Sequence, residues 1–207
     1  MMNQANIHSI FPVPIYTTRM DRAFTKKELQ FVKEQKNHTY KNTGNFTTHD
    51  TYVLDKKEFK NIKKFLERCC KDYLEKIICS KNNITLYITQ SWLNYTEESQ
   101  FHHKHEHPNS VVSGVLYLDT DVKTDQIVFS HPIRYQQIQA DVDKYNTWNS
   151  DSWWFPVKTG ELYMFPSSLT HQVVTKEGNN TRISLAFNTF YKGTLGSKDQ
   201  SCELIIS

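Results

Sequence analysis

A cluster of histidines is the first feature of this chain that could do chemistry. Four of its nine histidines fall within residues 102–107, and an apolar run over residues 111–118 follows at once. In an extended segment alternate side chains share one face, so His103, His105 and His107 would face one way. The opposite face would carry His102, Lys104 and Glu106. Imidazoles suit iron, zinc, copper and nickel alike, so the spacing predicts a metal site without naming the metal.

Two of the metal ligands would come from a His-x-His pair. We favour His105 and His107, because they lie closest to the apolar run and Pro108 stiffens the exit. His103 with His105 is the other pair that the spacing allows. A catalytic metal also needs a ligand from elsewhere in the chain, and His171, between two strand-like segments, is the candidate. A lone histidine in such a place is more often structural, so its interpretation depends on the residues that follow it.

Arg182 could bind an anionic co-substrate. Arg182 and Ser184 would share one face of a strand. An arginine on the inner face of a barrel strand requires an anion, because an unpaired buried charge is very costly. Its planar fork matches a carboxylate, and the hydroxyls of Ser184 and Tyr117 could donate beside it. An internal Arg–Glu pair or an exposed arginine is the alternative interpretation.

Two helices and a loop precede these residues. Thr25 and Glu28 form a T-x-x-E capping box, which predicts a helix over residues 26–35. Over residues 56–79 apolar side chains recur at helical spacing, with lysines and glutamates between them, which predicts a second helix with a packing face. Residues 37–52 are rich in Asn, Thr and Gly without a period, and we expect a loop there.

Strands dominate the second half of the chain. Residues 84–95 are β-branched and aromatic, and shorter strand-like segments follow between turn signals. These segments cover residues 111–119, 126–131, 160–165, 171–175 and 182–191. Near the N-terminus, residues 7–18 contain two prolines, which restrict them to an edge strand or strap. Helices followed by a run of strands predict a mostly β fold, an antiparallel sandwich or small barrel with helices packed outside one sheet.

A long insertion, residues 133–156, interrupts the strand rhythm. It carries Trp153, Trp154 and Phe155, which could close over a substrate as a lid, since long loops in compact domains are often binding loops. Hydrophobic packing of a long loop explains these aromatic side chains equally well.

Length and composition limit which partners and which location we expect for the protein. The 207 residues predict one domain, with an N-terminal strand and bracing helices (1–83), a β-barrel core (84–193) and a tail (194–207). The net charge of +3 is small and the basic residues are spread, which disfavours nucleic acid and anionic membrane as partners. The start of the chain lacks the pattern of a signal peptide, and the four cysteines lack CxxC spacing, so we expect a cytoplasmic protein with reduced cysteines.

Four segments, taken in order, resemble a known superfamily. They are W-L-N (92–94), H-x-H-P-N-S…S-G-V-x-Y-L (105–118), G-E-L…F-P-S…H-x-V (160–173) and R-I-S-x-A-F-N (182–188). This combination resembles the iron(II)/2-oxoglutarate-dependent oxygenases, and more narrowly a family of such oxygenases in bacteria and their viruses. The resemblance covers roughly the last 110 residues and implies a double-stranded β-helix, a squashed barrel of two antiparallel sheets braced by helices.

The resemblance also implies cofactors and residue roles. Iron(II) would be held by His105, His107 and His171. The distal carboxylate of 2-oxoglutarate would be bound by Arg182, with the help of Ser184 and Tyr117, and Asn94 would line the same pocket. With O2 as co-substrate, the implied activity is hydroxylation of an unidentified substrate, coupled to decarboxylation of 2-oxoglutarate to succinate.

His107 departs from the usual pattern of the superfamily. The common proximal motif is His-x-Asp or His-x-Glu, which completes a set of two histidines and one carboxylate. Three neutral ligands would leave the full double charge on the metal. Two other functions therefore stay open: a cupin-like metal-binding dioxygenase or isomerase that does not use 2-oxoglutarate, and a non-catalytic binding protein that retains the barrel.

Overall fold

Two antiparallel sheets form the body of the protein. The structure, a computed structural model, describes residues 5–131, 138 and 140–207. In spatial order the larger sheet contains β1 (Tyr16–Arg19), β9 (Glu161–Pro166), β6 (Val112–Asp119), β11 (Arg182–Leu195), β4 (Ile84–Thr96), β3 (Phe46–Thr48) and β2 (Thr39–Lys41), and β12 (Leu204–Ile206) pairs with β11. The smaller sheet contains β5 (His102–His105), β10 (His171–Val173), β7 (Gln126–Ser130) and β8 (Ser152–Pro156).

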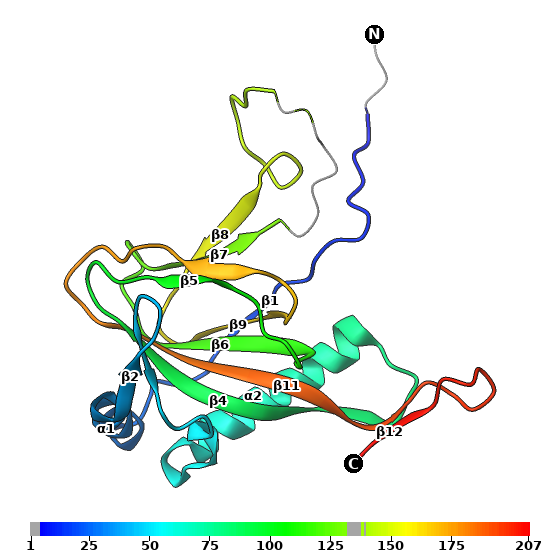
Figure 1. Cartoon of the computed structure of the whole chain (residues 1–207), viewed down its shortest axis with the longest axis horizontal. Coiled ribbons are helices and arrows are strands. Elements are labelled where there is room, and N and C mark those ends of the chain that lie inside the picture. The colour runs from blue at the N-terminus through cyan, green and yellow to red at the C-terminus, as the bar shows by residue number, and fades with distance from the viewer. Residues whose placement is uncertain (1–4, 132–137, 139) are drawn as a thin grey trace.

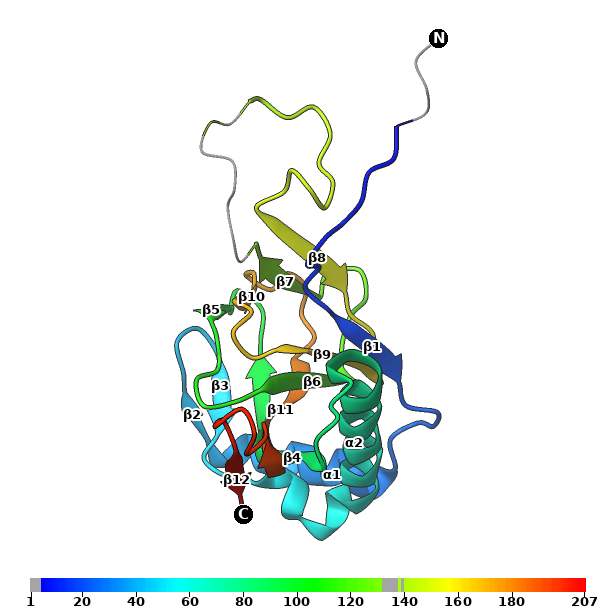
Figure 2. The same ribbon diagram turned by 90° about the vertical axis from the view of Figure 1, so that its right-hand side faces the viewer.

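The sheets and helices form layers, which Figure 1 and Figure 2 show from two sides. The smaller sheet lies over one face of the larger sheet, and the helices cover the other face. Helix α1 (Lys26–Gln35) and helix α2 (Lys60–Tyr73) share one hydrophobic core with the outward side chains of the larger sheet. A second hydrophobic cluster, with Tyr117 and Tyr163 from the larger sheet and Ile127 and Phe129 from the smaller, lies between the sheets.

The first helix confirms its sequence prediction. The Oγ atom of Thr25 accepts a hydrogen bond from the backbone N–H of Glu28 at 3.2 Å, and Oε2 of Glu28 accepts one from the backbone N–H of Thr25 at 2.7 Å. This capping box satisfies N–H groups that have no partner inside the helix. Arg22 adds two contacts of 2.6 and 2.8 Å to the Glu28 carboxylate, which is almost fully buried.

The second helix lies where the sequence predicts it, but the expected span is not a regular α-helix throughout. Its apolar stripe is buried, with Ile62 and Leu66 fully inaccessible. A 3₁₀ turn over Lys57–Phe59 precedes α2, and a π-helical turn over Leu74–Ile78 follows it. The backbone N–H of Cys79 closes that last turn on the carbonyl of Leu74 at 2.8 Å. The expected span therefore contains three helical geometries, which helical periodicity alone does not distinguish.

Two expectations about loops were wrong in part. Within residues 37–52, expected to be a loop, β2 and β3 form a hairpin whose second strand pairs with β4. Strands of three residues are too short to show a period, so residues 37–52 carry no recognisable strand signal. Within residues 133–156 the last five form strand β8, paired with β7. Positions 132–137 and 139 of this insertion lie outside the described residues.

The remaining strand predictions are confirmed. The N-terminal extended segment ends in β1, which pairs only with β9 and forms an edge of the larger sheet, as its prolines require. Residues 204–206, expected within the tail, add β12 beside β11. Among the described helices, none is long and apolar enough to cross a membrane.

Candidate active site

One cavity between the two sheets collects most of the residues that the sequence singled out. Strands β4, β6 and β11 supply its floor, and β5, β7 and β10 supply its opposite wall. The cavity is lined by Trp92, Asn94, His102, His105, His107, Val115, Tyr117, Ile127, His171, Gln172, Val173, Arg182, Ser184 and Ala186. All seven expected metal and co-substrate residues are therefore brought together.

Three histidines converge at one end of the cavity. Pairing of β5 with β10 sets His105 directly opposite His171, with ring centroids 4.3 Å apart. The ring of His107 lies 4.9 Å from His105 and 5.2 Å from His171. One ring nitrogen from each of the three residues lies within 4.8 Å of the other two. This is the spacing at which small side-chain adjustments let three imidazoles bind one ion.

Backbone carbonyls orient two of these rings. Nδ1 of His105 lies 2.7 Å from the carbonyl oxygen of His103, and Nδ1 of His171 lies 3.0 Å from that of Leu169. An Nδ1–H that donates to a carbonyl leaves the lone pair of Nε2 free for a metal. Burial lowers the pKa of His107 to about 4 and that of His171 to about 3, with the neighbouring His105 contributing. The rings are thus neutral near pH 7, which is the form that binds metals.

A β-bulge overturns the expected alternation of the histidines. Strand β5 pairs His105 with His171 but His102 with Val173, so three steps on β5 face two on β10. The extra residue turns His102 into the cavity, where its ring stacks on His105 at 4.5 Å with an interplanar angle of 14°. His103 does not line the cavity, although its ring stays 4.9 Å from that of His105. A bulge of one residue reverses the faces that a regular strand would present.

Both groups of candidate metal ligands among the described residues consist of histidines alone. The second group, His102, His103 and His105, also brings one nitrogen from each residue within 4.8 Å. The group with His107 and His171 joins two segments and includes a buried distal ligand, whereas the second group comes from a single strand. The group of His105, His107 and His171 would offer three neutral ligands to an ion.

Serine hydroxyls join the two loops that carry His107 and His171. Ser167 Oγ donates to Ser110 Oγ at 2.7 Å and lies 2.8 Å from Ser113 Oγ. The backbone N–H of His107 donates to the carbonyl of Ser167 at 2.9 Å. The P-N-S and F-P-S segments therefore have a physical role, because their serines hold the two histidine-bearing loops against each other.

Arg182 is a buried cation that lines the same cavity. It is 2% exposed, and no carboxylate of the described residues lies within 4.0 Å of its guanidinium. Its contacts are long, 3.5 Å to the carbonyl of Gln126 and 3.4 Å to Oγ1 of Thr96, and its Nε is buried without a partner. Burial lowers the pKa of Arg182, while Tyr117 and Asp125 oppose that shift. Arg182 is thus neither exposed nor paired with a glutamate of the described residues, which were the two alternatives considered from the sequence.

Three polar side chains accompany Arg182. The register of β11 sets Ser184 opposite Tyr117 on one side and Asn94 on the other. The Tyr117 hydroxyl is buried without a partner, and burial raises its pKa. Thr47 donates to Oδ1 of Asn94 at 2.9 Å, so Asn94 offers its amide N–H groups to the cavity. A buried cation, an unpaired hydroxyl and an amide donor suit a carboxylate, so the residues fit both groups that the resemblance implies.

Sequence reasoning missed several residues of the cavity. His102 was assigned to the opposite face, and the bulge that reverses it leaves no sequence signal. Thr47, which orients Asn94, lies in the hairpin that was expected to be a loop. Trp92 was noted only as part of a motif, yet it lines the cavity beside His107, at a ring distance of 5.7 Å.

The aromatic residues considered as a lid do not line the cavity. Phe155 packs against Phe129 and Tyr163 in the cluster between the sheets. Trp153 and Trp154 are 40% and 57% exposed on β8, the edge strand of the smaller sheet. The lid function stays a prediction for the two tryptophans, whereas Phe155 has the packing role that was the alternative.

Comparisons with known proteins give a family match over the segments that form this cavity. A family model described as "Putative 2OG-Fe(II) oxygenase" matches residues 90–188, a span that contains all the expected metal and co-substrate residues. No curated protein matches the chain.

Solved structures share the fold at low sequence identity. An oxidoreductase of the 2OG-Fe(II) oxygenase family from Burkholderia pseudomallei has 14% identity and a TM-score of 0.54, covering 84% of this chain and 83% of that one. HygX from Streptomyces hygroscopicus, with nickel, 2-oxoglutarate and hygromycin B bound, has 10% identity and a TM-score of 0.56 over 86% and 82%. The viral collagen prolyl hydroxylase of Paramecium Bursaria Chlorella virus-1, a 2OG complex, has 12% identity and a TM-score of 0.51 over 84% and 95%.

The structural likeness confirms the predicted double-stranded β-helix. The family match, in turn, covers the strands that bring the three histidines and Arg182 into one cavity. Residues 90–188 thus match the model of the 2OG-Fe(II) oxygenase family, whose cofactors are Fe(II) and 2-oxoglutarate.

Proposed function

We propose that this protein is a hydroxylase in which His105, His107 and His171 hold Fe(II) and Arg182 binds the distal carboxylate of 2-oxoglutarate. One observation carries the proposal: a single cavity contains a neutral three-imidazole group and a buried guanidinium without an anion. A buried, unpaired charge is costly and persists where a ligand satisfies it. The substrate is a small molecule or a side chain that reaches this cavity.

The electrostatics of the cavity suit a dicarboxylate. Three neutral histidines leave the double charge of an Fe(II) ion uncompensated by the protein. Arg182 adds a second positive centre in the same cavity. 2-Oxoglutarate carries one carboxylate at each end, so it can neutralise both centres at once. This complementarity favours 2-oxoglutarate over a co-substrate with a single negative charge, and it separates the proposal from a cupin-like site.

The chain's own residues bind and orient the metal and the co-substrate. Carbonyls of His103 and Leu169 hold the imidazole rings, and the serine contacts hold their loops. Arg182 and the Tyr117 hydroxyl donate to the distal carboxylate, in a dry environment that strengthens each hydrogen bond. When bound, iron and 2-oxoglutarate would supply the oxidation with O2: one oxygen atom would enter succinate as 2-oxoglutarate loses CO2, and the other would hydroxylate the substrate.

Anaerobic titration of the Fe(II) protein with 2-oxoglutarate tests this proposal. The chelate has a weak visible metal-to-ligand charge-transfer band. We expect the band in the wild-type protein, its absence in His171→Ala for want of iron, and a much weaker band in Arg182→Ala at the same co-substrate concentration. Arg19→Ala, at an exposed arginine on β1, is the matched control and should behave as the wild type. Iron bound without a band would favour the cupin-like function, and no iron bound would favour a non-catalytic barrel.

The cysteines support a reducing, cytoplasmic location. None of the four forms a disulfide, and Cys69 and Cys70 are buried on α2. Burial raises the pKa of the Cys69 thiol to about 11 and that of Cys70 to about 12, so both are unreactive packing residues.

A further inference from the structure

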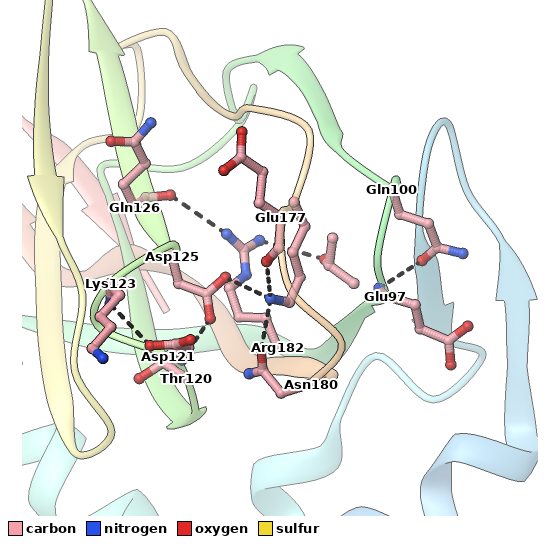
Figure 3. Close-up of polar contacts among 12 residues, drawn as sticks. Glu97, Gln100, Thr120, Asp121, Lys123, Asp125, Gln126, Glu177, Asn180 and Arg182 are labelled. Atoms are coloured by element: carbon pink, nitrogen blue, oxygen red, sulfur yellow. Dashed lines mark hydrogen bonds and ion pairs between the residues drawn. The ribbon is translucent and has the colours of Figure 1, made fainter.

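A buried ion pair lies next to Arg182. Lys176, in the segment between β10 and β11, places its Nζ 3.3 Å from Oδ1 of Asp125, and the two side chains are 1% and 2% exposed. Asp125 directly precedes β7, so the pair links the start of β7 to the segment between β10 and β11. Figure 3 shows Asp125, Asn180 and Arg182 gathered around this contact.

The remaining hydrogen bonds of the pair are also made within the protein. Nζ of Lys176 donates to Oδ1 of Asn180 at 2.8 Å and to the carbonyl of Glu177 at 2.9 Å. The other carboxylate oxygen of Asp125, Oδ2, accepts from the backbone N–H of Asp121 at 2.8 Å. Both oxygens of Asp125 are therefore occupied, one by the ammonium and one by a backbone amide.

Arg182 lies within the electric field of Asp125 but is not paired with it. Asp125 is one of the groups that oppose the lowered pKa of Arg182, yet the two side chains form no ion pair within 4.0 Å. Among the described residues, the buried charges of this cluster are thus two cations, Lys176 and Arg182, and one anion, Asp125. Asp125 and Lys176 also act on the pKa of Asp119, but Asp119 is exposed to water. The buried cluster has one positive charge in excess, which matches one carboxylate of a ligand.

We propose that Lys176 is a positioning residue for co-substrate binding. By holding Asp125 in place, it prevents that carboxylate from pairing with Arg182 and leaves the guanidinium charge for the distal carboxylate of 2-oxoglutarate. The proposal rests on the proposed function of Arg182. Without Lys176, Asp125 would be a buried anion beside an unpaired buried cation, and the two would pair because neither has another partner of opposite charge.

The proposal predicts that removing the two partners of one ion pair has different effects on the Kd for 2-oxoglutarate. In Lys176→Met, Asp125 is released toward Arg182 and competes with the ligand, so the Kd for 2-oxoglutarate should rise about tenfold or more. In Asp125→Asn, the competing anion is gone, so the Kd should be equal to that of the wild type or lower. The double variant Lys176→Met/Asp125→Asn should return the Kd to within about threefold of the wild type, since paired residues are not additive.

Titration of each anaerobic Fe(II) protein with 2-oxoglutarate, beside an Fe(II) titration and a thermal melt, decides the matter. Affinity for Fe(II) should stay within about twofold in all three variants, because their effect is at the anion end. Lys36→Met, which breaks the exposed Lys36–Glu97 pair of 2.6 Å, is the matched control and should change neither affinity.

A purely structural ion pair predicts a different pattern. Both single variants would then weaken 2-oxoglutarate binding in proportion to their loss of melting temperature, and that outcome overturns the proposal. Unchanged affinity in a folded Lys176→Met protein also overturns it. If Lys176→Met does not fold, Asp125→Asn and the double variant decide, because weakened binding in either contradicts the proposal. Failure of the wild type itself to bind 2-oxoglutarate would reject the proposed function instead.

Discussion

The two faces of strand β11 differ in how completely their side chains are satisfied. Leu185 and Phe187 point toward the helices and are fully inaccessible in a continuous hydrophobic core. Arg182 and Ser184 point toward the smaller sheet and are buried as well, yet they are polar. Alternation along one strand thus separates a face that stabilises the fold from a face that is prepared for ligands.

Unsatisfied polar atoms mark the second face. Five buried side-chain atoms of the described residues have no hydrogen-bond partner, and they include Nε of Arg182, the Tyr117 hydroxyl and Nδ1 of His103. Each such group costs about 1–3 kcal/mol in the absence of a partner. Arg182 and Tyr117 both line the cavity, which indicates that the protein retains this cost there for binding.

The largest expected effect is on the helix face. Phe187→Ala should lower the free energy of unfolding by about 3–5 kcal/mol, because it removes a fully buried ring. The ring lies where a side chain at Gly114 would be, so the variant leaves a cavity between β6 and β11. Urea unfolding measures the loss, and affinity for 2-oxoglutarate at low temperature should be retained. Lost affinity with unchanged stability would contradict the division between the two faces.

The next effect distinguishes the two histidine groups on the cavity face. His107→Ala should weaken Fe(II) binding by more than about 100-fold, since even residues behind metal ligands contribute 10–100-fold. His103→Ala should change that affinity by no more than about tenfold, through its neighbour His105. Fe(II) titration of both variants is the measurement. A larger loss in His103→Ala than in His107→Ala would assign the metal to the His102, His103 and His105 group.

The smallest effect is at the start of α1 and depends on pH. Burial opposes ionisation of Glu28, but hydrogen bonds from Arg22 and Thr25 outweigh it and lower the pKa of its carboxyl. A carboxyl with a lowered folded pKa stabilises the protein above its ordinary pKa and loses that contribution as the pH falls. Glu28→Gln should therefore cost about 1–3 kcal/mol at pH 7.

Below the ordinary glutamate pKa of about 4.3, the difference between wild type and Glu28→Gln should shrink. Urea unfolding of both proteins at neutral and acidic pH measures it. Glu34→Gln, at an exposed position on the same helix, is the control and should show little difference at either pH. A difference that is constant with pH would contradict the role assigned to the ionised carboxyl.

Much of the site could be predicted because its residues follow regular periods or form ordered motifs. Arg182 and Ser184 alternate along a regular strand, so their shared face follows from the geometry of any β-strand. The capping box of Thr25 and Glu28 is local, and it predicted α1 without knowledge of the rest of the fold. The roles of His105, His107 and His171 came from a resemblance, and they stay predictions although the fold brings the three rings together.

The sequence by itself determined what depends on neighbours along the chain: the helices, most strands and the residue types of the metal and anion sites. Only the tertiary structure decided what depends on pairing between distant segments. The bulge that turns His102 inward is defined by the register of β5 against β10, and the Lys176–Asp125 contact joins segments about 50 residues apart. Neither has a local signal, because both arise from the closing of the two sheets around one cavity.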